Sequence, residues 1–306
     1  MPGLLCTPPL AERLGRRIRD LGARPVDAGD EFEAAYLSGD VWNRCYPEFT
    51  AACLAAGRLR WLQTSSAGVD RPEFGRLLDR GVRLTTASGA AADSIAGSVV
   101  MYLLALSRDL PIHLRDQSAR RWRTTGWRDL TGRTVGVLGM GPIGRRTATL
   151  LTAHGMRPIG LRRRPAGDEP CETWPVARLL ELATDAAALV VAAPLTEHTQ
   201  GIVDRKVLTA LGPDGFLVNV ARGGLVDEPA LIEVLLGGGL GGAALDVTAT
   251  EPLPAHSPLW DHPNVIITPH VSGLSDLTVT RTDEQFLDNL RRWLAGEPLH
   301  NEVRRA

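Results

Sequence analysis

Three side chains suited to proton transfer and anion binding lie in the second half of the chain, each after a predicted strand. Arg222 precedes two glycines, Glu251 precedes a proline, and His270 ends the segment Thr268-Pro-His. Histidine exchanges protons near neutral pH, and the planar fork of arginine can hold a carboxylate through two hydrogen bonds. Taken singly, Arg222 could form a surface salt bridge, Glu251 could be a solvated loop residue, and His270 could cap a turn. Because all three follow strands of one predicted sheet, together they indicate a catalytic site.

A glycine-rich turn, Gly139-x-Gly141-x-x-Gly144, follows the apolar run Val135–Leu138 and precedes an amphipathic helix candidate. In such a strand–turn–helix unit the first glycine permits the sharp turn, and the second lets a pyrophosphate approach the backbone. The third lets the helix pack close to the strand. The free N–H groups at the helix N-terminus then favour phosphate. The turn therefore predicts dinucleotide binding, although a glycine turn that binds nothing is the alternative in a chain with 32 glycines.

The elements that would position these residues alternate between strands and helices. Such alternation predicts a parallel sheet covered by helices, with ligands at the carboxyl ends of its strands. The expected strands are Val135–Leu138, Arg157–Leu161, Ala188–Ala193, Phe216–Val220, Gly242–Val247 and Val265–Thr268. The expected helices are Arg145–His154, Leu179–Ala183 and Glu228–Leu236.

The N-terminal part is typical of a smaller α/β unit. Glu12–Leu21 has the apolar spacing of a helix, and Arg58–Gln63 and Arg83–Ala87 are strand candidates. The loop Thr64–Asp70 consists mostly of small residues, so its backbone N–H groups could hold an anion. Taken alone, it is more simply an ordinary turn between a strand and a helix.

Two helices bear on the domain organisation. Ile95–Leu110 is apolar nearly all round, which predicts burial between two units. The amphipathic stretch Thr280–Ala295 is long enough to return to the N-terminal unit. The sequence thus predicts a discontinuous domain of residues 1–98 and 281–306 and a continuous dinucleotide-binding domain of residues 99–280.

Composition narrows the class of protein. A chain of 306 residues with 44% hydrophobic and 23% charged residues can form two globular domains. The net charge of −1 and the lack of long basic runs give no reason to expect a nucleic-acid or anionic-membrane partner. No run approaches the about 20 apolar residues of a membrane helix. Four cysteines without a CxxC pair predict reduced thiols, no metal site and a cytoplasmic location.

In these residues the sequence resembles the D-isomer-specific, NAD(P)-dependent 2-hydroxyacid dehydrogenases, including those of the glyoxylate/hydroxypyruvate reductase type. The spacings of 29 residues from Arg222 to Glu251 and 19 residues from Glu251 to His270 match the family. The matching segments are Ser65–Asp70, Leu130–Gly144, Pro194–Thr196, Asn219–Gly223, Leu245–Val247, Glu251–Pro252 and Thr268–His270.

The resemblance implies two Rossmann-like domains with doubly wound parallel sheets and a cleft that closes between them. It implies reversible hydride transfer between a nicotinamide and C2 of a 2-keto acid, giving a D-2-hydroxy acid. His270 would exchange the proton of the keto oxygen, Glu251 would hydrogen-bond His270, and Arg222 would hold the substrate carboxylate and polarise the carbonyl group. Backbone amides around Ser66, Ala67 and Gly68 would also bind the carboxylate.

The resemblance further implies a cofactor site and a homodimer. Asp246 would bond the nicotinamide carboxamide. The dimer interface would include the helix after Ile95 and the region of Trp122, although a solvated connector is an equal reading of that region. The implied cofactor-binding residues are Gly139, Gly141, Pro142, Ile143, Gly144, Arg162, Arg163, Pro194, Thr199, Val220, Ala221, Asp246, His270 and Gly273.

One position bears on the choice of cofactor. An acidic residue about 20 positions after the glycine turn would hold the ribose hydroxyls of NAD, but this chain has Arg162-Arg163-Arg164 there. The first acid after them is Asp168, beyond a proline and a glycine. Arginine attracts a 2′-phosphate, so the sequence predicts a preference for NADP(H), with NAD(H) possible if the arginines are only a solvated loop.

Glyoxylate and hydroxypyruvate are the leading substrate candidates. Two alternatives stay open: a phosphoglycerate or phosphonate oxidoreductase on the same fold, and a non-catalytic protein that senses NAD(P).

Overall fold

In a computed structural model, which describes residues 1–42 and 44–303, the chain divides into two compact units. The first comprises Met1–Ala91 and Leu274–Ala306, and the second comprises Ala92–Gly273. Both boundaries fall seven residues before the positions 98 and 280 expected from the sequence. The reason is that α4 (Ala92–Ser107) is one continuous helix packed on the second unit, while α10 (Asp276–Ala295) begins at its Ser275 cap.

The first unit is built on a five-stranded parallel sheet in the order β2-β1-β3-β4-β5. Its strands are Gly3–Leu5 (β1), Arg24–Val26 (β2), Ala34–Leu37 (β3), Trp61–Thr64 (β4) and Arg83–Thr85 (β5). One apolar layer joins the sheet to α1 (Pro8–Leu21) and α10, and the other joins it to α2 (Tyr46–Ala55) and α3 (Pro72–Asp79). This is the doubly wound order of flavodoxin-like sheets.

The second unit contains a seven-stranded parallel sheet in the order β12-β11-β10-β9-β6-β7-β8. Its strands are Thr134–Leu138 (β6), Arg157–Arg162 (β7), Thr173–Pro175 (β8), Ala188–Val191 (β9), Phe216–Asn219 (β10), Gly242–Leu245 (β11) and Val265–Ile267 (β12). The chain reverses its direction of travel across the sheet between β6 and β9. Such a switch point is where Rossmann folds bind dinucleotides.

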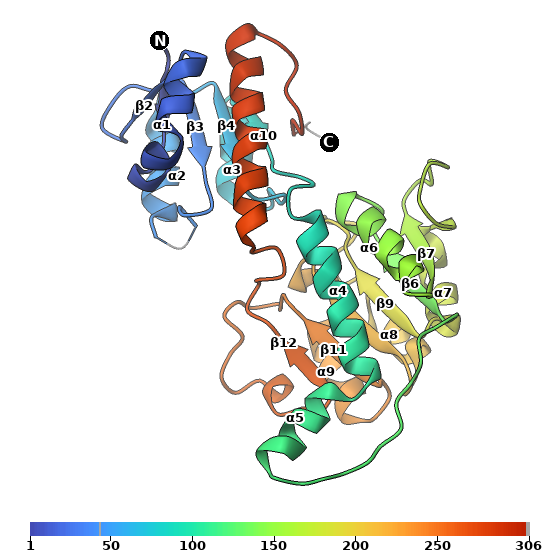
Figure 1. The fold of residues 1–306 in the computed structure, drawn as a ribbon. Coiled ribbons are helices and arrows are strands. Elements are labelled where there is room, and N and C mark those ends of the chain that lie inside the picture. Colours follow the sequence, from blue (N-terminus) through green and yellow to red (C-terminus); the bar gives the residue numbers. More distant parts are fainter. Residues whose placement is uncertain (43, 304–306) are drawn as a thin grey trace. The chain divides into compact units, whose positions relative to one another are not determined.

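Helices cover both faces of the second sheet. α4 and α6 (Pro142–Ala153) lie side by side over one face, as Figure 1 shows. α7 (Leu179–Asp185), α8 (Arg205–Leu211) and α9 (Glu228–Leu236) share the apolar layer of the other face. The predicted fold class, α/β with two doubly wound parallel sheets, is confirmed.

The long apolar helix differs from its prediction. It runs from Ala92 to Ser107 instead of Ile95 to Leu110, and α5 (Leu110–Ser118) follows as a separate helix. The break lies at Asp109, whose φ of 51° is left-handed, next to a proline in the first turn of α5. The helix is not buried all round, because Met101 is 53% exposed. Within the described residues no single helix could cross a membrane; only α4 and α5 together reach the length and composition, across a 66° bend.

Candidate active site

The carboxyl ends of six strands in the second unit are level with one another, because the last residues paired between them form one row across the sheet. The row, from β7 to β12 across the sheet, is Leu161, Leu138, Val191, Asn219, Leu245 and Ile267. Arg162, Gly139 and Asp246 come directly after members of this row, and His270 comes three residues after its last member. With about 4.8 Å between neighbouring strands, the row is about 24 Å long. The predicted site residues of this unit therefore gather along one edge of one sheet.

The glycine turn lies at the switch point, between β6 and α6. Gly139 has a φ of +100°, and a Cβ there would lie 2.6 Å from the backbone of Ala193. A Cβ on Gly144 would lie 1.8 Å from the carbonyl oxygen of Gly139. Gly141 instead faces open space, with no heavy atom within 4 Å of an added Cβ. Among the described residues no side chain caps α6, so the N–H groups of Ile143 and Gly144 in its first turn are free to bind an anion.

Arg222 is held in a turn at the end of β10 by a buried asparagine. The side chain of Asn219 donates to the carbonyl oxygen of Arg222 at 3.0 Å and accepts from the N–H of Ala221 at 3.1 Å. Gly223 brings this turn against the loop after β11, since a Cβ there would lie 2.0 Å from the carbonyl of Thr248. The half-buried Arg222 donates from Nη1 to the carbonyl oxygen of Ala221 at 2.8 Å.

His270 and Glu251 form the hydrogen-bonded pair that the resemblance implies. Nδ1 of His270 lies 2.9 Å from Oε2 of Glu251, and the N–H of Thr248 donates to the other carboxylate oxygen at 3.3 Å. An ionised carboxylate only accepts, so Nδ1 carries the hydrogen and Nε2 is the nitrogen left for a ligand. Both side chains are nearly half exposed, at 49% and 41%. His270 has a left-handed φ of 56°, fixed by its N–H bond to the carbonyl oxygen of Asp246 at 2.8 Å.

The carboxylate of Asp246 is buried and accepts from four donors. These are the hydroxyl of Thr268 at 2.6 Å, the N–H of Val271 at 2.9 Å, and the N–H and hydroxyl of Ser272. Four donors match the approximate capacity of a carboxylate. The resemblance implies a bond from Asp246 to a nicotinamide carboxamide, which stays a prediction; the structure shows that the carboxylate holds the loop that carries His270.

Tyr102 on α4 extends this network, and residue types alone gave no sign of it. Its hydroxyl lies 2.7 Å from that of Thr268. Because Thr268 uses its hydrogen on Asp246, Tyr102 must be the donor. Burial is the main cause that raises the pKa of Tyr102, so its hydroxyl keeps the hydrogen that this role requires.

Arg162, at the end of β7, is paired with Glu169, an acid that the sequence pattern did not indicate. Its Nη1 donates to Oε1 of Glu169 at 2.7 Å. The N–H groups of Ala166 and Gly167 donate to the same carboxylate at 2.8 Å each. These two N–H bonds and Arg162 lower the pKa of Glu169 to about 2. Glu169 lies only one residue past Asp168, but a turn through a proline and a glycine brings it back to the strand end.

The remaining predicted residues occupy loops of both units. In the second unit, Thr199 donates to the carbonyl oxygen of Pro194 at 2.7 Å, Val220 directly follows β10, and Gly273 is the last residue. In the first unit, the hydroxyl of Ser66 donates to the carbonyl oxygen of Gly68 at 2.8 Å. The exposed Ala67 lies between them, and its N–H and that of Gly68 make no hydrogen bond with any residue in 1–42 or 44–303.

Comparison with known families decides the identity. The sequence profile of the D-isomer specific 2-hydroxyacid dehydrogenase NAD binding domain matches residues 100–272. The chain belongs to this family. It is an NAD(P)-dependent D-2-hydroxyacid dehydrogenase, as the resemblance predicts.

The relatives of this dehydrogenase include proteins named as reductases. Glyoxylate/hydroxypyruvate reductase A of Arabidopsis thaliana is 34% identical over 250 residues, which cover 80% of this chain and 78% of the relative. A D-isomer specific 2-hydroxyacid dehydrogenase from Xanthobacter autotrophicus Py2, solved with NADPH and MES, superposes with a TM-score of 0.81 at 29% identity, covering 99% and 98% of the two chains. An NADPH-dependent glyoxylate/hydroxypyruvate reductase from Sinorhizobium meliloti, solved with NADP and sulfate, gives 0.82 at 27% identity, with the same coverage.

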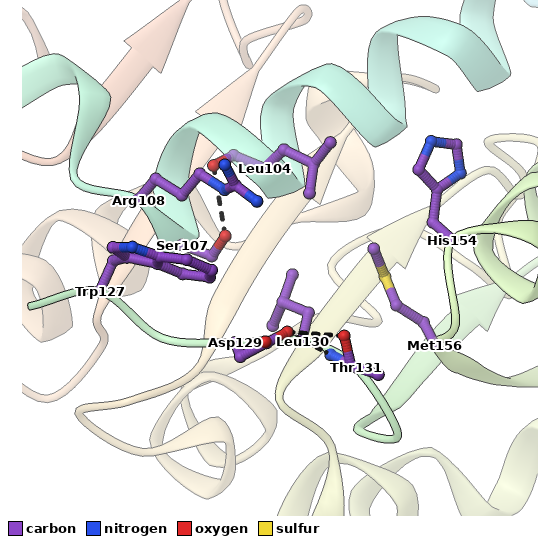
Figure 2. A pocket seen from close by; sticks show the side chains of 9 residues that line it. All are labelled: Leu104, Ser107, Arg108, Trp127, Asp129, Leu130, Thr131, His154 and Met156. Atoms are coloured by element: carbon purple, nitrogen blue, oxygen red, sulfur yellow. Dashed lines mark hydrogen bonds between the residues drawn. The ribbon is translucent and has the colours of Figure 1, made fainter.

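A pocket of about 180 Å³ lies at the opposite edge of the dehydrogenase's second sheet. Figure 2 shows Arg108 at the end of α4 stacked on Trp127, with His154 across the pocket. Asp129 and Thr131 precede β6, so the pocket lies near the amino ends of the strands and is separate from the candidate active site. Among residues 1–42 and 44–303, no three His, Cys, Asp or Glu side chains are grouped as a metal site.

Proposed function

We propose that this dehydrogenase reduces a small 2-keto acid, of the glyoxylate or hydroxypyruvate type, to a D-2-hydroxy acid with NADPH. The order of groups along the strand ends carries the proposal. His270 and Arg222 follow strands β12 and β10 near one end, the glycine turn follows β6 farther along the sheet, and Arg162 lies beyond it at the end of β7. This order matches the nicotinamide, pyrophosphate and adenosine ends of one extended dinucleotide. The names of the Arabidopsis and Sinorhizobium relatives support the substrate class.

The residues divide the chemistry as follows. The bound nicotinamide would supply the hydride that reduces C2. Nε2 of His270 gives a proton to the keto oxygen, so that hydride plus proton convert the ketone to the alcohol. Glu251 holds the ring by Nδ1 and stabilises the protonated imidazole. Arg222 holds the carboxylate and stabilises the charge that develops on the oxygen.

Further residues would position the imidazole of His270 and bind the substrate. Asp246 and the hydroxyls around it fix the backbone of the His270 loop, so that the imidazole is already in place before the substrate arrives. The free N–H groups of Ala67 and Gly68 are assigned to the substrate carboxylate on the resemblance alone.

The cofactor preference rests on charge at the end of β7. Arg163 and Arg164 are exposed, and Asp168, the nearest acid in sequence, pairs with Arg145 at 3.2 Å. The carboxylate of Glu169 at this strand end is engaged by Arg162 and by the N–H groups of Ala166 and Gly167, and three arginines offer their charge to a 2′-phosphate. NADP(H) is therefore the proposed cofactor, with NAD(H) as a weaker substitute.

The decisive test is a spectrophotometric panel of 2-keto acids with NADPH and with NADH. It should include glyoxylate, hydroxypyruvate, aryl and branched keto acids, and a phosphorylated 2-keto acid. We expect turnover with glyoxylate or hydroxypyruvate and a kcat/KM at least tenfold higher with NADPH. A tenfold preference for NADH contradicts the cofactor proposal, and a preference for the phosphorylated acid contradicts the substrate proposal. Cofactor binding without any turnover favours a sensor.

Two alanine substitutions in the glycine turn separate binding from folding. Gly141→Ala is expected to lower the free energy of unfolding by no more than about 1 kcal/mol, the scale of an altered helix cap, because its Cβ meets open space. It should nevertheless weaken NADPH binding at least tenfold, since that space would hold the pyrophosphate. Gly144→Ala is expected to lower the free energy of unfolding by about 3 kcal/mol or more, because its Cβ overlaps a backbone oxygen. Urea unfolding and NADPH titration check both, and equal effects on unfolding contradict the assignment.

A homodimer and a cytoplasmic location are also proposed. Large apolar side chains are exposed on α4, α5 and the segment after them, including Met101, Leu114 and the 98% exposed Trp122. Covering such a surface with a second copy removes apolar area from water. The four free cysteines agree with a reducing compartment. Light scattering measures the mass of the particle in solution and so tests the homodimer. Imaging of a fluorescent fusion tests the cytoplasmic location.

A further inference from the structure

Glu169 is a charged side chain buried beneath the loop that carries Arg163 and Arg164. Its side chain is 2% exposed, whereas that of Arg162, which it contacts, is 35% exposed. Acids are almost never buried unless they are paired and hydrogen-bonded. Here one carboxylate accepts from the guanidinium of Arg162 and from the backbone N–H groups of Ala166 and Gly167. The acid thus joins the strand end to the loop that follows it.

This carboxylate acts on all three arginines. It fixes one side of the Arg162 guanidinium, and guanidinium has five N–H donors, so others remain for a second anion. It also bonds the N–H groups of Ala166 and Gly167, so it anchors both ends of the segment that carries Arg163 and Arg164. Since the pKa of Glu169 is about 2, the group stays ionised throughout the pH range in which an enzyme is assayed.

A buried acid here could have two opposite effects on a 2′-phosphate. Its negative charge offsets that of Arg162 and repels the phosphate. Its hydrogen bonds order an arginine that would otherwise lose much rotational freedom on binding. Three donors already compensate the carboxylate charge, and the side chain lies beneath the surface. The ordering effect therefore outweighs the repulsion.

We propose that Glu169 is a positioning residue for the adenosine 2′-phosphate and sets the preference of the enzyme for NADPH over NADH. It holds Arg162 and the loop 163–168 in the arrangement that receives the phosphate. This inference rests on the proposed use of NADPH.

The test measures binding of two probes by calorimetry, without turnover: 2′,5′-ADP, which carries the 2′-phosphate, and 5′-ADP, which lacks it. Wild type is expected to bind 2′,5′-ADP at least tenfold more tightly. Glu169→Gln should reduce this preference about five- to tenfold by weakening 2′,5′-ADP binding, with 5′-ADP unchanged. In an Arg162→Gln background the same change should have much less effect, because the two residues act as a unit.

Asp168→Asn is the matched control. It removes one negative charge from the same loop, but its carboxylate bonds Arg145 and not Arg162. If charge alone mattered, both substitutions would tighten 2′,5′-ADP binding; positioning predicts that only Glu169→Gln weakens it. Glu169→Asp keeps the charge but shortens the side chain, so it should also weaken binding, and it serves if the glutamine variant does not fold.

An unchanged or increased preference in both Glu169 variants overturns the inference while leaving NADPH use intact. A wild-type protein that binds the two probes equally overturns the proposed NADPH preference, and the role of Glu169 with it.

Discussion

Replacing His270 with asparagine is expected to lower kcat for 2-keto acid reduction by about 10²- to 10⁴-fold, the usual contribution of a positioned general acid. Asparagine cannot donate a titratable proton to the keto oxygen, although its side chain still reaches Glu251. His270 also stands at a left-handed φ of 56°, and asparagine tolerates that conformation better than most residues. The loss should therefore come from chemistry and not from a disturbed loop. Steady-state kinetics measure it.

Two controls define this result. The exposed His256 lies in the loop after Glu251, so His256→Asn removes a histidine without touching the proposed site and should leave kcat unchanged. Binding of NADPH to His270→Asn, measured by fluorescence titration, should change by less than a few fold. Adding Glu251→Gln to His270→Asn should cost little more, because Glu251 acts through the imidazole. A kcat within threefold of wild type in His270→Asn contradicts the assignment.

Replacing Arg222 with glutamine is expected to lower kcat by about 10²- to 10³-fold, the effect of removing one donor from a developing oxyanion. KM for the keto acid should rise as well, because the same fork holds the carboxylate before reaction. Arg222→Lys keeps the charge but loses the planar pair of donors, so it should recover only part of the activity. The kinetics of both variants, measured over a range of keto acid concentrations, separate the two effects.

The structure supplies the control for this position too. The turn is held through the carbonyl oxygen of Arg222 and the side chain of Asn219, so a change of the arginine side chain should leave the free energy of unfolding nearly unaltered. Lys206, on α8, is an exposed cation that is not among the proposed site residues, and Lys206→Gln should have normal kinetics. Wild-type kcat and KM in Arg222→Gln contradict the role of the arginine.

The sequence predicts most of the second unit because its strands are continuous apolar runs. Val135–Leu138 and Arg157–Leu161 agree with the structure to within one residue. In the first unit, β1, β2 and β3 were missed, because strands of three or four residues are too short for periodicity to reveal. The His270–Glu251 pair follows from the resemblance, and the structure brings the two side chains together.

The acids were less predictable. The resemblance implies a ligand contact for Asp246, and its four hydrogen bonds within the protein could not be predicted because they arise from a loop whose shape no residue pattern specifies. Glu169 was passed over because its contact with Arg162 depends on how seven residues turn back. The contact of Tyr102 with Thr268 could not be predicted either, because Tyr102 lies in an apolar helix, where an aromatic residue is most often part of the core. Each of these contacts depends on tertiary packing.

Along the row of strand ends, the residues proposed to select the cofactor lie apart from those proposed to act on the keto acid. The residues proposed to select the cofactor follow β7, and those proposed to act on the keto acid follow β10, β11 and β12, with two strands in between. Substitutions farther apart than about 10 Å usually have additive free energies. Cofactor and substrate preference can therefore be varied by combining independently selected changes at the two ends, and the kinetic effects of the combinations should multiply.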